Sequence, residues 1–345
     1  MKFEPVLDRG RLIATVRDAY GLPITEMRFV PAGEVAICYV LSCGDNARHF
    51  LKLWSDTDAG RRSAARRDVY LPLTRALYDR GLLQRLSYPL LARDGALWAD
   101  FDGLPLAVFP FLPGTPLPLD VVEWPDALVV ALARDVATLH RATAALHDLL
   151  PPRETFAIPF EDELVRALAE VERIGPRDRP GLRALRRLLE PRRDEIAGLL
   201  ARLHHLQAVV RELQESFVVC HTDLGGHNTL VDAGAHLYLL DWDDVILAPP
   251  EHDVQTAAGG AFARFVWGYR ENGGAWPLRI EHFAFYLLRR HLGDATMRVL
   301  RENTSDEQDE DALYGIEAYG IAMWAALDAT LGEMREALEQ GDSAA

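Results

Sequence analysis

Short apolar runs separated by turn residues fill the first part of the chain, after one helical pattern. Residues 8–20 have the spacing of a short helix that ends at Gly21. Three runs rich in Val, Ile, Leu and aromatic residues follow, at 27–30, 35–41 and 48–54, with turn residues at 31–34 and 43–46. Such runs are typical of antiparallel strands joined by short turns. The pattern therefore predicts a three-stranded meander.

A longer helical stretch and two more strands complete this part. Residues 61–80 are helical in composition, and Gly81 follows them. Apolar runs at 97–101 and 106–111 flank an Asp102-Gly103 turn, which is a hairpin signal. Residues 112–118 then contain three prolines and a glycine. We expect this stiff segment to separate an N-terminal domain, residues 1–111, from a C-terminal domain, residues 112–345.

Helical periodicity dominates the remainder of the chain. Residues Leu128, Leu132, Val136 and Leu139 share one helix face, after a start signal at Pro125. Further helices are expected over 160–173, over 180–214 with an interruption at Pro191, and between 253 and 338. Strands and loops at 216–247 interrupt them. The order predicts an α+β protein with a β-rich N-terminal part and a mostly helical C-terminal part.

Composition narrows the classes of protein that remain. The chain has 345 residues, of which 49% are hydrophobic, and its formal net charge is −15. These values exclude a disordered or fibrous protein, and the negative charge disfavours a broad nucleic-acid surface. Three cysteines, an odd number without metal-like spacing, favour a reducing compartment. The sequence shows no signal peptide or membrane-spanning run, so we expect no membrane partner and a cytoplasmic location.

Lysine is rare in this chain, which makes its placement informative. Only Lys2 and Lys52 are lysines among the 37 basic residues. Lys52 lies inside the apolar run 50–54, which is expected to be a strand. A lysine at such a position either extends along a strand edge to reach water or binds an anionic ligand. Its surroundings in the fold decide between the two interpretations.

Polar residues gather at the ends of two apolar strands within 216–247. His221 and Asp223 follow the run 217–220, and Asn228 comes five residues after Asp223. Asp241 ends the second run, thirteen residues after Asn228, and begins the sequence Asp-Trp-Asp-Asp. This spacing fits a hairpin that returns the chain to its starting point.

Phosphoryl transfer from a nucleotide needs such a set of residues. An aspartate orients the acceptor hydroxyl and takes its proton, while an asparagine and a second aspartate hold Mg²⁺. A lysine from elsewhere in the fold neutralises phosphate charge. Asp223, Asn228, Asp241 and Lys52 can fill these roles, and the turn at 31–34 can cover the phosphates.

The segments 221–228 and 240–253 resemble the catalytic and metal-binding loops of the aminoglycoside phosphotransferase family, which is related to the protein kinases. The run 240–244 with 247–253 looks like the spectinomycin phosphotransferase branch. This resemblance implies a bilobal kinase-like fold that uses ATP and Mg²⁺, with a nucleotide-binding lobe at 1–111 and a catalytic and substrate-binding lobe at 112–345.

The resemblance also implies roles for individual residues. Asp223 would be the catalytic base, Asn228 and Asp241 the metal ligands, and Lys52 the lysine on the α- and β-phosphates. Three more positions match the family's motif: His221 would pack the catalytic loop, Asp253 would brace it, and Asp243 would assist at the metal site.

Four further positions are expected to contact the nucleotide or its lysine. The Pro110 carbonyl and the Leu112 amide lie where the family reads adenine, and Gly33 lies in the loop over the phosphates. The family commonly pairs its lysine with a glutamate on the next helix, but residues 61–80 contain no glutamate. Asp68 is the expected substitute as partner of Lys52.

Acidic residues concentrate at the C-terminal end, which in the family forms the antibiotic side of the cleft. Residues 294–345 include thirteen acidic and three basic residues. Clustered carboxylates favour a cationic small-molecule antibiotic as the partner, besides the nucleotide. Asp294 and Glu317 are the candidate substrate-binding residues.

The sequence therefore favours an ATP-dependent O-phosphotransferase of an aminoglycoside or aminocyclitol, with spectinomycin as the preferred substrate. Two alternatives stay open at this point. One is a metabolic small-molecule kinase of the same fold, acting on choline, homoserine, methylthioribose or a fructosamine. The other is a kinase-like binding protein without turnover. The absence of a glutamate partner for Lys52 on residues 61–80 favours this alternative.

Overall fold

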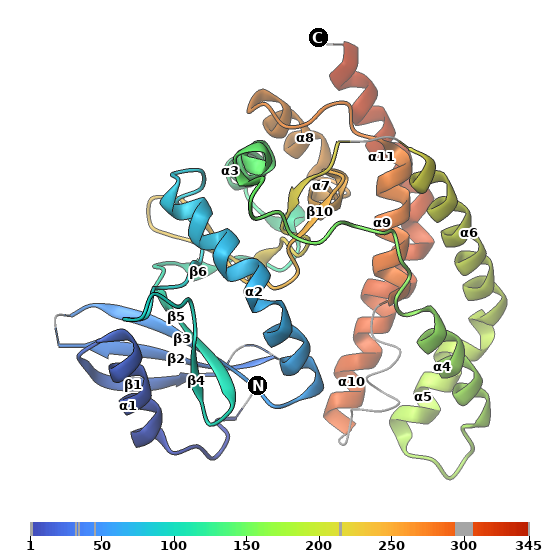
Figure 1. Cartoon of the computed structure of the whole chain (residues 1–345). Helices are drawn as coiled ribbons and strands as arrows, with labels where there is room; N and C mark the ends of the chain where they lie inside the picture. Colours follow the sequence, from blue (N-terminus) through green and yellow to red (C-terminus); the bar gives the residue numbers. More distant parts are fainter. Residues whose placement is uncertain are drawn as a thin grey trace. The chain divides into compact units, whose positions relative to one another are not determined.

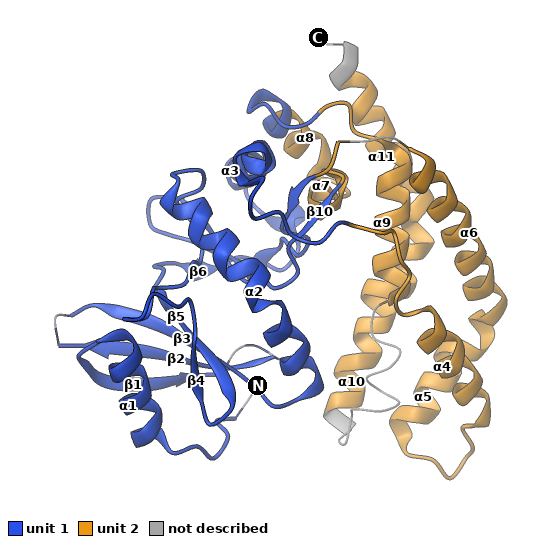
Figure 2. Cartoon of the chain, in the orientation of Figure 1, with its two compact units in different colours: residues 1–153, 218–248, 268–275 blue, residues 154–217, 249–267, 276–345 orange. Residues whose placement is uncertain are grey.

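The computed structural model describes residues 3–31, 33, 35–44, 46–213, 216–293 and 306–343. The chain forms two compact units, which Figure 2 shows in different colours. Unit 1 comprises Met1–Arg153, Val218–Ala248 and Gly268–Ala275, and unit 2 comprises Glu154–Phe217, Pro249–Trp267 and Trp276–Ala345. Each unit thus joins segments that are far apart in the sequence. The lobe boundary at residue 112 concerns a functional division, and it stays a prediction.

An antiparallel sheet of five strands forms the first part of unit 1 (Figure 1). Its order is β1-β2-β3-β5-β4, with β1 at Ile24–Val30, β2 at Ala36–Cys43, β3 at Arg48–Trp54, β4 at Ala99–Phe101 and β5 at Leu104–Pro110. The three-stranded meander and the later hairpin predicted from the sequence are confirmed. Helix α1, Arg9–Tyr20, precedes the sheet and ends at Gly21, whose φ of 71° is the left-handed conformation that glycine favours.

The alternation of side chains along β3 decides which residues enter the core. Leu51 and Leu53 are fully buried, and they belong to one apolar cluster with Leu12 and Val16 of α1. Successive side chains of a strand point to opposite faces, so Lys52 projects to the face opposite this cluster. The register places Lys52 opposite Cys38 on β2 and Ala107 on β5.

Helix α2, Asp58–Asp79, follows β3 directly. Thr57 caps its N-terminus, because its side chain accepts a hydrogen bond from the Gly60 amide at 3.0 Å. The helix therefore begins three residues before the predicted start at 61. Tyr70 and Ser63 are buried on the side of α2 that faces the sheet residues Trp54 and Lys52.

Short strands carry the remainder of unit 1. β6, Thr115–Pro116, pairs with β8, Thr229–Val231, which pairs with β9, Leu237–Leu239. β7, Val218–Cys220, pairs with β10, Ile246–Ala248. Helix α3, Asp126–Ala142, begins after Pro125, where the sequence places its start. The loops between these short strands contain the polar residues of the 216–247 segment.

Unit 2 consists of helices. They are α4 at Glu161–Arg173, α5 at Pro180–Leu189, α6 at Arg193–Glu212, α7 at Glu251–Val254, α9 at Ile280–Gly293, α10 at Asp306–Gly315, a π-helical turn at Ile316–Ile321 and α11 at Ala322–Ser343. Helix α8, Phe262–Glu271, belongs partly to each unit. A 3₁₀ turn at Glu190–Arg192 separates α5 from α6, at the proline that the sequence identified as an interruption. No helix among the described residues is long and apolar enough to cross a membrane.

Candidate active site

The loop after β7 carries Asp223 and requires glycine at one position. Gly226 donates its amide to the Leu119 carbonyl at 3.0 Å, and a Cβ atom on Gly226 would lie 1.9 Å from the Pro118 carbonyl oxygen. A larger residue would therefore push the loop away from residues 118–119. Gly226 thus has a packing reason in this chain.

Two neighbours fix the orientation of the Asp223 carboxylate. His227 Nε2 donates to Asp223 Oδ2 at 3.0 Å, and Asn228 Nδ2 donates to the same oxygen at 2.8 Å. Asn228 Nδ2 also donates to the Asp223 carbonyl at 2.9 Å. With its nitrogen directed to Asp223, Asn228 presents its side-chain oxygen as the atom that can ligate a cation. The Asp223 side chain is 41% exposed, so an acceptor hydroxyl can reach it.

His221 joins the two loops of the site from below the surface. It is fully buried, and its Nε2 donates to the Leu240 carbonyl at 2.7 Å, one residue before Asp241. The Asp223 amide donates to His221 Nδ1 at 3.4 Å, and the His221 ring lies 4.6 Å from the Trp242 ring. These contacts place His221 between the loops as a packing residue, in the role that the family resemblance implies.

Lys52 reaches the second loop and contacts two of its carboxylates. Lys52 Nζ lies 3.0 Å from Asp241 Oδ1, 2.9 Å from Asp243 Oδ1 and 3.0 Å from Asp243 Oδ2. The Lys52 side chain is 12% exposed and that of Asp243 is 13% exposed, whereas Asp241 is 49% exposed. Asp243 therefore holds the lysine within the protein, and Asp241 extends toward solvent, where a metal ion can bind.

Helix α2 is tied to the same loop through neutral and cationic groups. Ser63 Oγ donates to Asp243 Oδ2 and accepts a hydrogen bond from Trp54 Nε1 at 2.9 Å. Arg66 donates through Nε to the Asp243 carbonyl and through Nη2 to the Val245 carbonyl at 2.8 Å. The helix therefore positions the loop that holds Lys52.

The structure corrects the partner expected for Lys52. The Asp68 carboxylate accepts a hydrogen bond from Trp98 Nε1 at 3.2 Å, lies 3.7 Å from Arg67 Nη2 and is 65% exposed. Asp68 comes two residues after Arg66, which places it about 200° farther around the helix, and there it contacts Trp98. Asp243 takes the place in the ion pair that we assigned to Asp68, because it lies on the loop that already carries Asp241.

The ion pairs keep the site charged. Burial would lower the pKa of Lys52, but Tyr70, Asp241 and Asp243 outweigh burial and raise that pKa well above its ordinary value. Burial would likewise raise the pKa of Asp241, and the charge and hydrogen bond of Lys52 lower it instead. Asp241 is therefore an anionic oxygen ligand at neutral pH, which suits a hard cation such as Mg²⁺.

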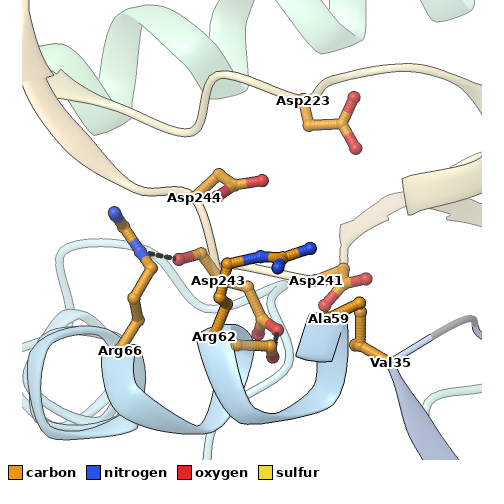
Figure 3. Close-up of a pocket in the computed structure, with 9 residues that line it drawn as sticks. Val35, Ala59, Arg62, Arg66, Asp223, Asp241, Asp243 and Asp244 are labelled. Atoms are coloured by element: carbon orange, nitrogen blue, oxygen red, sulfur yellow. Dashed lines mark hydrogen bonds between the residues drawn. The ribbon is translucent and has the colours of Figure 1, made fainter. Parts of the chain in front are cut away.

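A cavity of about 390 Å³ brings these groups together within unit 1. Asp223 and Asp241 line it with Asp243 and Asp244, and α2 contributes Arg62, Ser63 and Arg66. Figure 3 shows the Asp223 carboxylate on one side of the space and the Asp241 carboxylate on the other. The side chains of Arg62 and Arg66 extend from α2 in the same view. The residue expected as base and one expected metal ligand therefore share one cavity.

The segment at the end of β5 carries the two backbone groups expected to bind adenine. The Phe111 amide donates to the Arg48 carbonyl on β3 at 3.3 Å. Because the carbonyl and the amide of one trans peptide bond point in opposite directions, the Pro110 carbonyl points away from β3. Gly33 has a φ of 85°, so the turn before β2 uses a conformation that glycine favours. The binding roles of Pro110, Leu112 and Gly33 stay predictions.

The remaining predicted residues are not among those that line the cavity. Asp253 is buried in α7 of unit 2, and Glu317 is exposed in the π-helical turn of unit 2. Asp294 lies outside the described residues. The structure thus brings together Asp223, Asn228, Asp241, Lys52 and His221, and it leaves the substrate-binding assignments as predictions.

Sequence reasoning missed the contributions of His227, Ser63, Arg66 and Arg62. His227 directly precedes Asn228, the asparagine expected as a metal ligand, so its place in the loop was a usable signal. The α2 residues had no such signal, because a serine and several arginines on a helix rich in arginine look like ordinary surface residues. Only the packing of α2 against the second loop distinguishes them.

Comparison with known proteins adds to this geometry. The model of the phosphotransferase enzyme family matches residues 44–302, which include the sheet lysine and both loops. A comparison with curated protein sequences gives no match.

Several solved structures are similar in fold. A spectinomycin phosphotransferase in complex with ADP and spectinomycin superposes with a TM-score of 0.75 at 17% identity, covering 95% of this chain and 99% of that chain. An aminoglycoside phosphotransferase from Alicyclobacillus acidocaldarius subsp. acidocaldarius gives 0.67 at 18% identity, covering 98% of both chains. A microcompartment-associated aminopropanol kinase gives 0.59 at 16%, covering 93% and 98%. At these identities the likeness establishes the kinase-like fold that the sequence predicted.

Proposed function

Because the chain belongs to the phosphotransferase enzyme family, we propose that it transfers the γ-phosphoryl group of ATP to a hydroxyl of an aminocyclitol or aminoglycoside antibiotic. Spectinomycin is the preferred acceptor. The family predicted from the sequence is the one that the family model matches. The single observation that carries the proposal is the cavity in unit 1, where Asp223, Asp241 and Asp243 meet beside Lys52.

The acceptor hydroxyl would bind at Asp223. His227 and Asn228 hold one oxygen of this carboxylate, which fixes its direction without neutralising its charge. Asp223 orients the hydroxyl and accepts its proton as the oxygen attacks the γ-phosphorus in line. The bond between that phosphorus and the β,γ-bridging oxygen breaks, and ADP leaves with the electron pair.

Binding of the nucleotide follows from the other residues of unit 1. The Pro110 carbonyl would accept from the adenine amino group, the Leu112 amide would donate to the ring, and the turn at Gly33 would lie over the phosphates. Lys52 would contact the α- and β-phosphates. In this role it exchanges part of its contact with Asp241 and Asp243 for the phosphate oxygens.

The oxygen donors of this site fit Mg²⁺. Asp241 is half exposed and its pKa is lowered, and Asn228 presents a carbonyl oxygen, so both are ligands of the type that this ion prefers. When bound, the ion would neutralise charge on the β- and γ-phosphates. A crystallised ADP complex of the similar spectinomycin phosphotransferase supports a nucleotide in this fold.

The acidic C-terminal region supports a cationic acceptor. Residues 294–345 carry thirteen acidic and three basic residues, and a cationic antibiotic would be attracted to such a field. Glu317 is exposed and can contact a ligand, and Asp294 keeps its assignment as a substrate-binding residue from the sequence resemblance.

A metabolic kinase is the second candidate. The fold is also similar to that of an aminopropanol kinase, so the architecture suits a small amino alcohol as well as an antibiotic. The same catalytic residues would act in both cases. The two candidates differ in the acceptor, which only a substrate assay distinguishes.

The test is ADP release from Mg-ATP with purified protein and a panel of spectinomycin, aminoglycosides, macrolides, choline, homoserine and aminopropanol. We expect ADP release that depends on spectinomycin. Asp223→Asn should lower kcat about 10²–10⁴-fold, the usual effect of losing a general base, and should leave the thermal unfolding temperature nearly unchanged. Release with a metabolite alone would support the second candidate. Binding without turnover would contradict both and favour a binding protein.

A further inference from the structure

Arg62 differs from Arg66, the other arginine that lines the cavity. Asp241 and Asp243 are paired with Lys52, Arg66 donates to two backbone carbonyls, and Asp223 accepts from His227 and Asn228. Arg62 makes no hydrogen bond or ion pair with any residue that the structure describes. It is nevertheless one of the residues that form the cavity wall.

The direction of Arg62 is visible in Figure 3. Its side chain leaves α2, and its guanidinium extends into the space that the Asp223 and Asp241 carboxylates border. An exposed arginine gains only a modest stabilisation from an ion pair with a nearby carboxylate. The Asp223, Asp241 and Asp243 carboxylates have other partners, so the guanidinium remains available to an incoming anion.

Arg61, the residue before it, shows the contrasting arrangement. Arg61 contacts the carboxylates of Asp56 and Asp58 on the exposed surface, with Nη1 2.6 Å from Asp56 Oδ1. Neither aspartate lines the cavity. Two neighbouring arginines on one helix therefore have opposite surroundings, one paired at the surface and the other unpaired in the cavity.

A phosphoryl group in transfer needs a cationic hydrogen-bond donor beside its terminal oxygens. In phosphoryl transfer the charge spreads over three equatorial oxygens, and it is stabilised by cations fixed before the reaction. Lys52 is held by Asp243 at the inner end of the site, and the proposed function places it on the α- and β-phosphates. The terminal phosphate, which must lie between Asp223 and Asp241, still lacks a cation from the protein. A planar guanidinium suits two phosphate oxygens at once.

We propose that Arg62 is a further catalytic residue, which binds the terminal phosphate of the nucleotide and stabilises it during transfer. The proposal rests on the proposed function, because it requires a nucleoside triphosphate in this cavity. The position of Arg62 on α2 also links this role to the loop that Ser63 and Arg66 hold, since all three residues belong to one helix.

Nucleotide binding tests the proposal directly. Calorimetry would compare Mg-ADP with Mg-AMP-PNP, which differ in the terminal phosphate, for the wild type and for Arg62→Ala. We expect the variant to bind Mg-AMP-PNP about 10–100-fold more weakly, the size of one or two lost charge-assisted hydrogen bonds, and to bind Mg-ADP within about twofold of the wild type. Its kcat with Mg-ATP should fall about 10²–10³-fold.

Two further variants serve as controls. Arg61→Ala removes a neighbouring arginine with the same chemistry from the surface, and it should change neither nucleotide affinity nor kcat. Arg62→Lys keeps the charge and loses the planar fork, so it should restore part of the affinity for Mg-AMP-PNP. Thermal unfolding should be nearly the same for all three variants, because both arginines are exposed.

The outcomes separate the two proposals. If the wild type prefers Mg-AMP-PNP to Mg-ADP and Arg62→Ala keeps that preference, the role of Arg62 is wrong and the proposed function stands. An increase in the KM of the acceptor alone would also overturn it, because Arg62 would then contact the acceptor. If the wild type binds neither nucleotide, the proposed function fails, and the role of Arg62 fails with it.

Discussion

Two buried sites, one around Lys52 in unit 1 and one around His282 in unit 2, treat ionisable groups in opposite ways. In unit 1 the Lys52 ammonium lies within 3.0 Å of two carboxylates, and its pKa is well above the ordinary value. In unit 2 His282 is fully buried, and neither ring nitrogen has a hydrogen-bond partner among the described residues. Burial lowers the pKa of His282 to about 4, with Arg279 adding to the effect. The site around Lys52 keeps its charge, and the site around His282 keeps the histidine neutral.

The difference shows where charge is needed. Burying an ion costs several kcal/mol unless close partners compensate, so a protein that only needs stability does better with a neutral or apolar group. Around His282, unit 2 follows that rule, since the rings of Phe156 and Tyr286 lie within 6.4 Å of its imidazole. The Glu251 carboxylate is 3.9 Å from His282 Nδ1, beyond hydrogen-bond distance. Unit 1 departs from it at Lys52. The departure is explained if the charge meets phosphate there.

Removing the Lys52 charge should have the largest effect. In Lys52→Met, Asp243 loses its cation while it remains largely buried, and we expect the free energy of unfolding to fall by about 3–5 kcal/mol. The kcat/KM for Mg-ATP should fall about 10²–10³-fold. Urea unfolding measures the first quantity, and steady-state kinetics measure the second.

The double variant Lys52→Met/Asp243→Asn separates stability from function. Asparagine carries no charge, so no unpaired charge remains buried at position 243. The double variant should therefore regain much of the lost stability and none of the activity. Lys52→Arg, which keeps the charge, should stay folded and keep part of the activity. Full activity in Lys52→Met would contradict the phosphate role and would support a strand lysine with a structural function.

The two loops that carry the candidate catalytic and metal-binding residues could be predicted because these residues lie at short, characteristic spacings in the sequence. His221, Asp223 and Asn228 lie within eight residues, and Asp241 follows at the end of the next apolar run. The strand that carries Lys52 was also recognisable, because a single lysine interrupts an apolar run in a chain with few lysines. These signals depend on neighbours in sequence, which a pattern can capture.

The partner of Lys52 could not be predicted, because it depends on packing between distant segments. Asp68 was the natural choice on α2 by analogy with the family, yet the helix meets the second loop through Ser63 and Arg66. Asp243, which completes the ion pair, is 191 residues from Lys52. A rotation of α2 about its axis by a fraction of a turn changes which side chains reach the loop, and composition does not determine that rotation.

Acidification should destabilise unit 2 around the buried His282, while the ion pairs between Lys52 and Asp241 or Asp243 in unit 1 remain intact. A histidine with a folded pKa near 4 binds fewer protons when folded than when unfolded, so its contribution to stability is lost as the pH falls from 6.5 toward 4. His282 should account for about 2 kcal/mol of lost stability between pH 7 and pH 5. The lowered pKa of Asp241 keeps that carboxylate ionised over the same range, and its contribution is lost only below about pH 4.

Hydrogen exchange of α9 at pH 7 and pH 5 measures this effect in the helix that carries His282. His282→Phe cannot titrate at this position and should show a smaller loss of protection. His205 on α6 is exposed and provides a matched control, since His205→Asn should leave the pH dependence of exchange in α9 unchanged. Equal pH dependence in wild type and His282→Phe would show that the buried histidine is not responsible.

The smallest expected effect concerns the contact between α2 and the charged loop of unit 1. Ser63→Ala leaves the fully buried Trp54 Nε1 without its acceptor and removes a donor to Asp243, so we expect a loss of about 1–2 kcal/mol in stability. Activity should fall about tenfold, through a lower kcat, because Asp243 positions Lys52. Thr74→Ala is the control on the same helix: its buried hydroxyl donates to the Tyr70 and Leu71 carbonyls of α2. This variant should lose similar stability and keep its kcat, and an equal loss of kcat in both variants would mean that α2 acts only through its own stability.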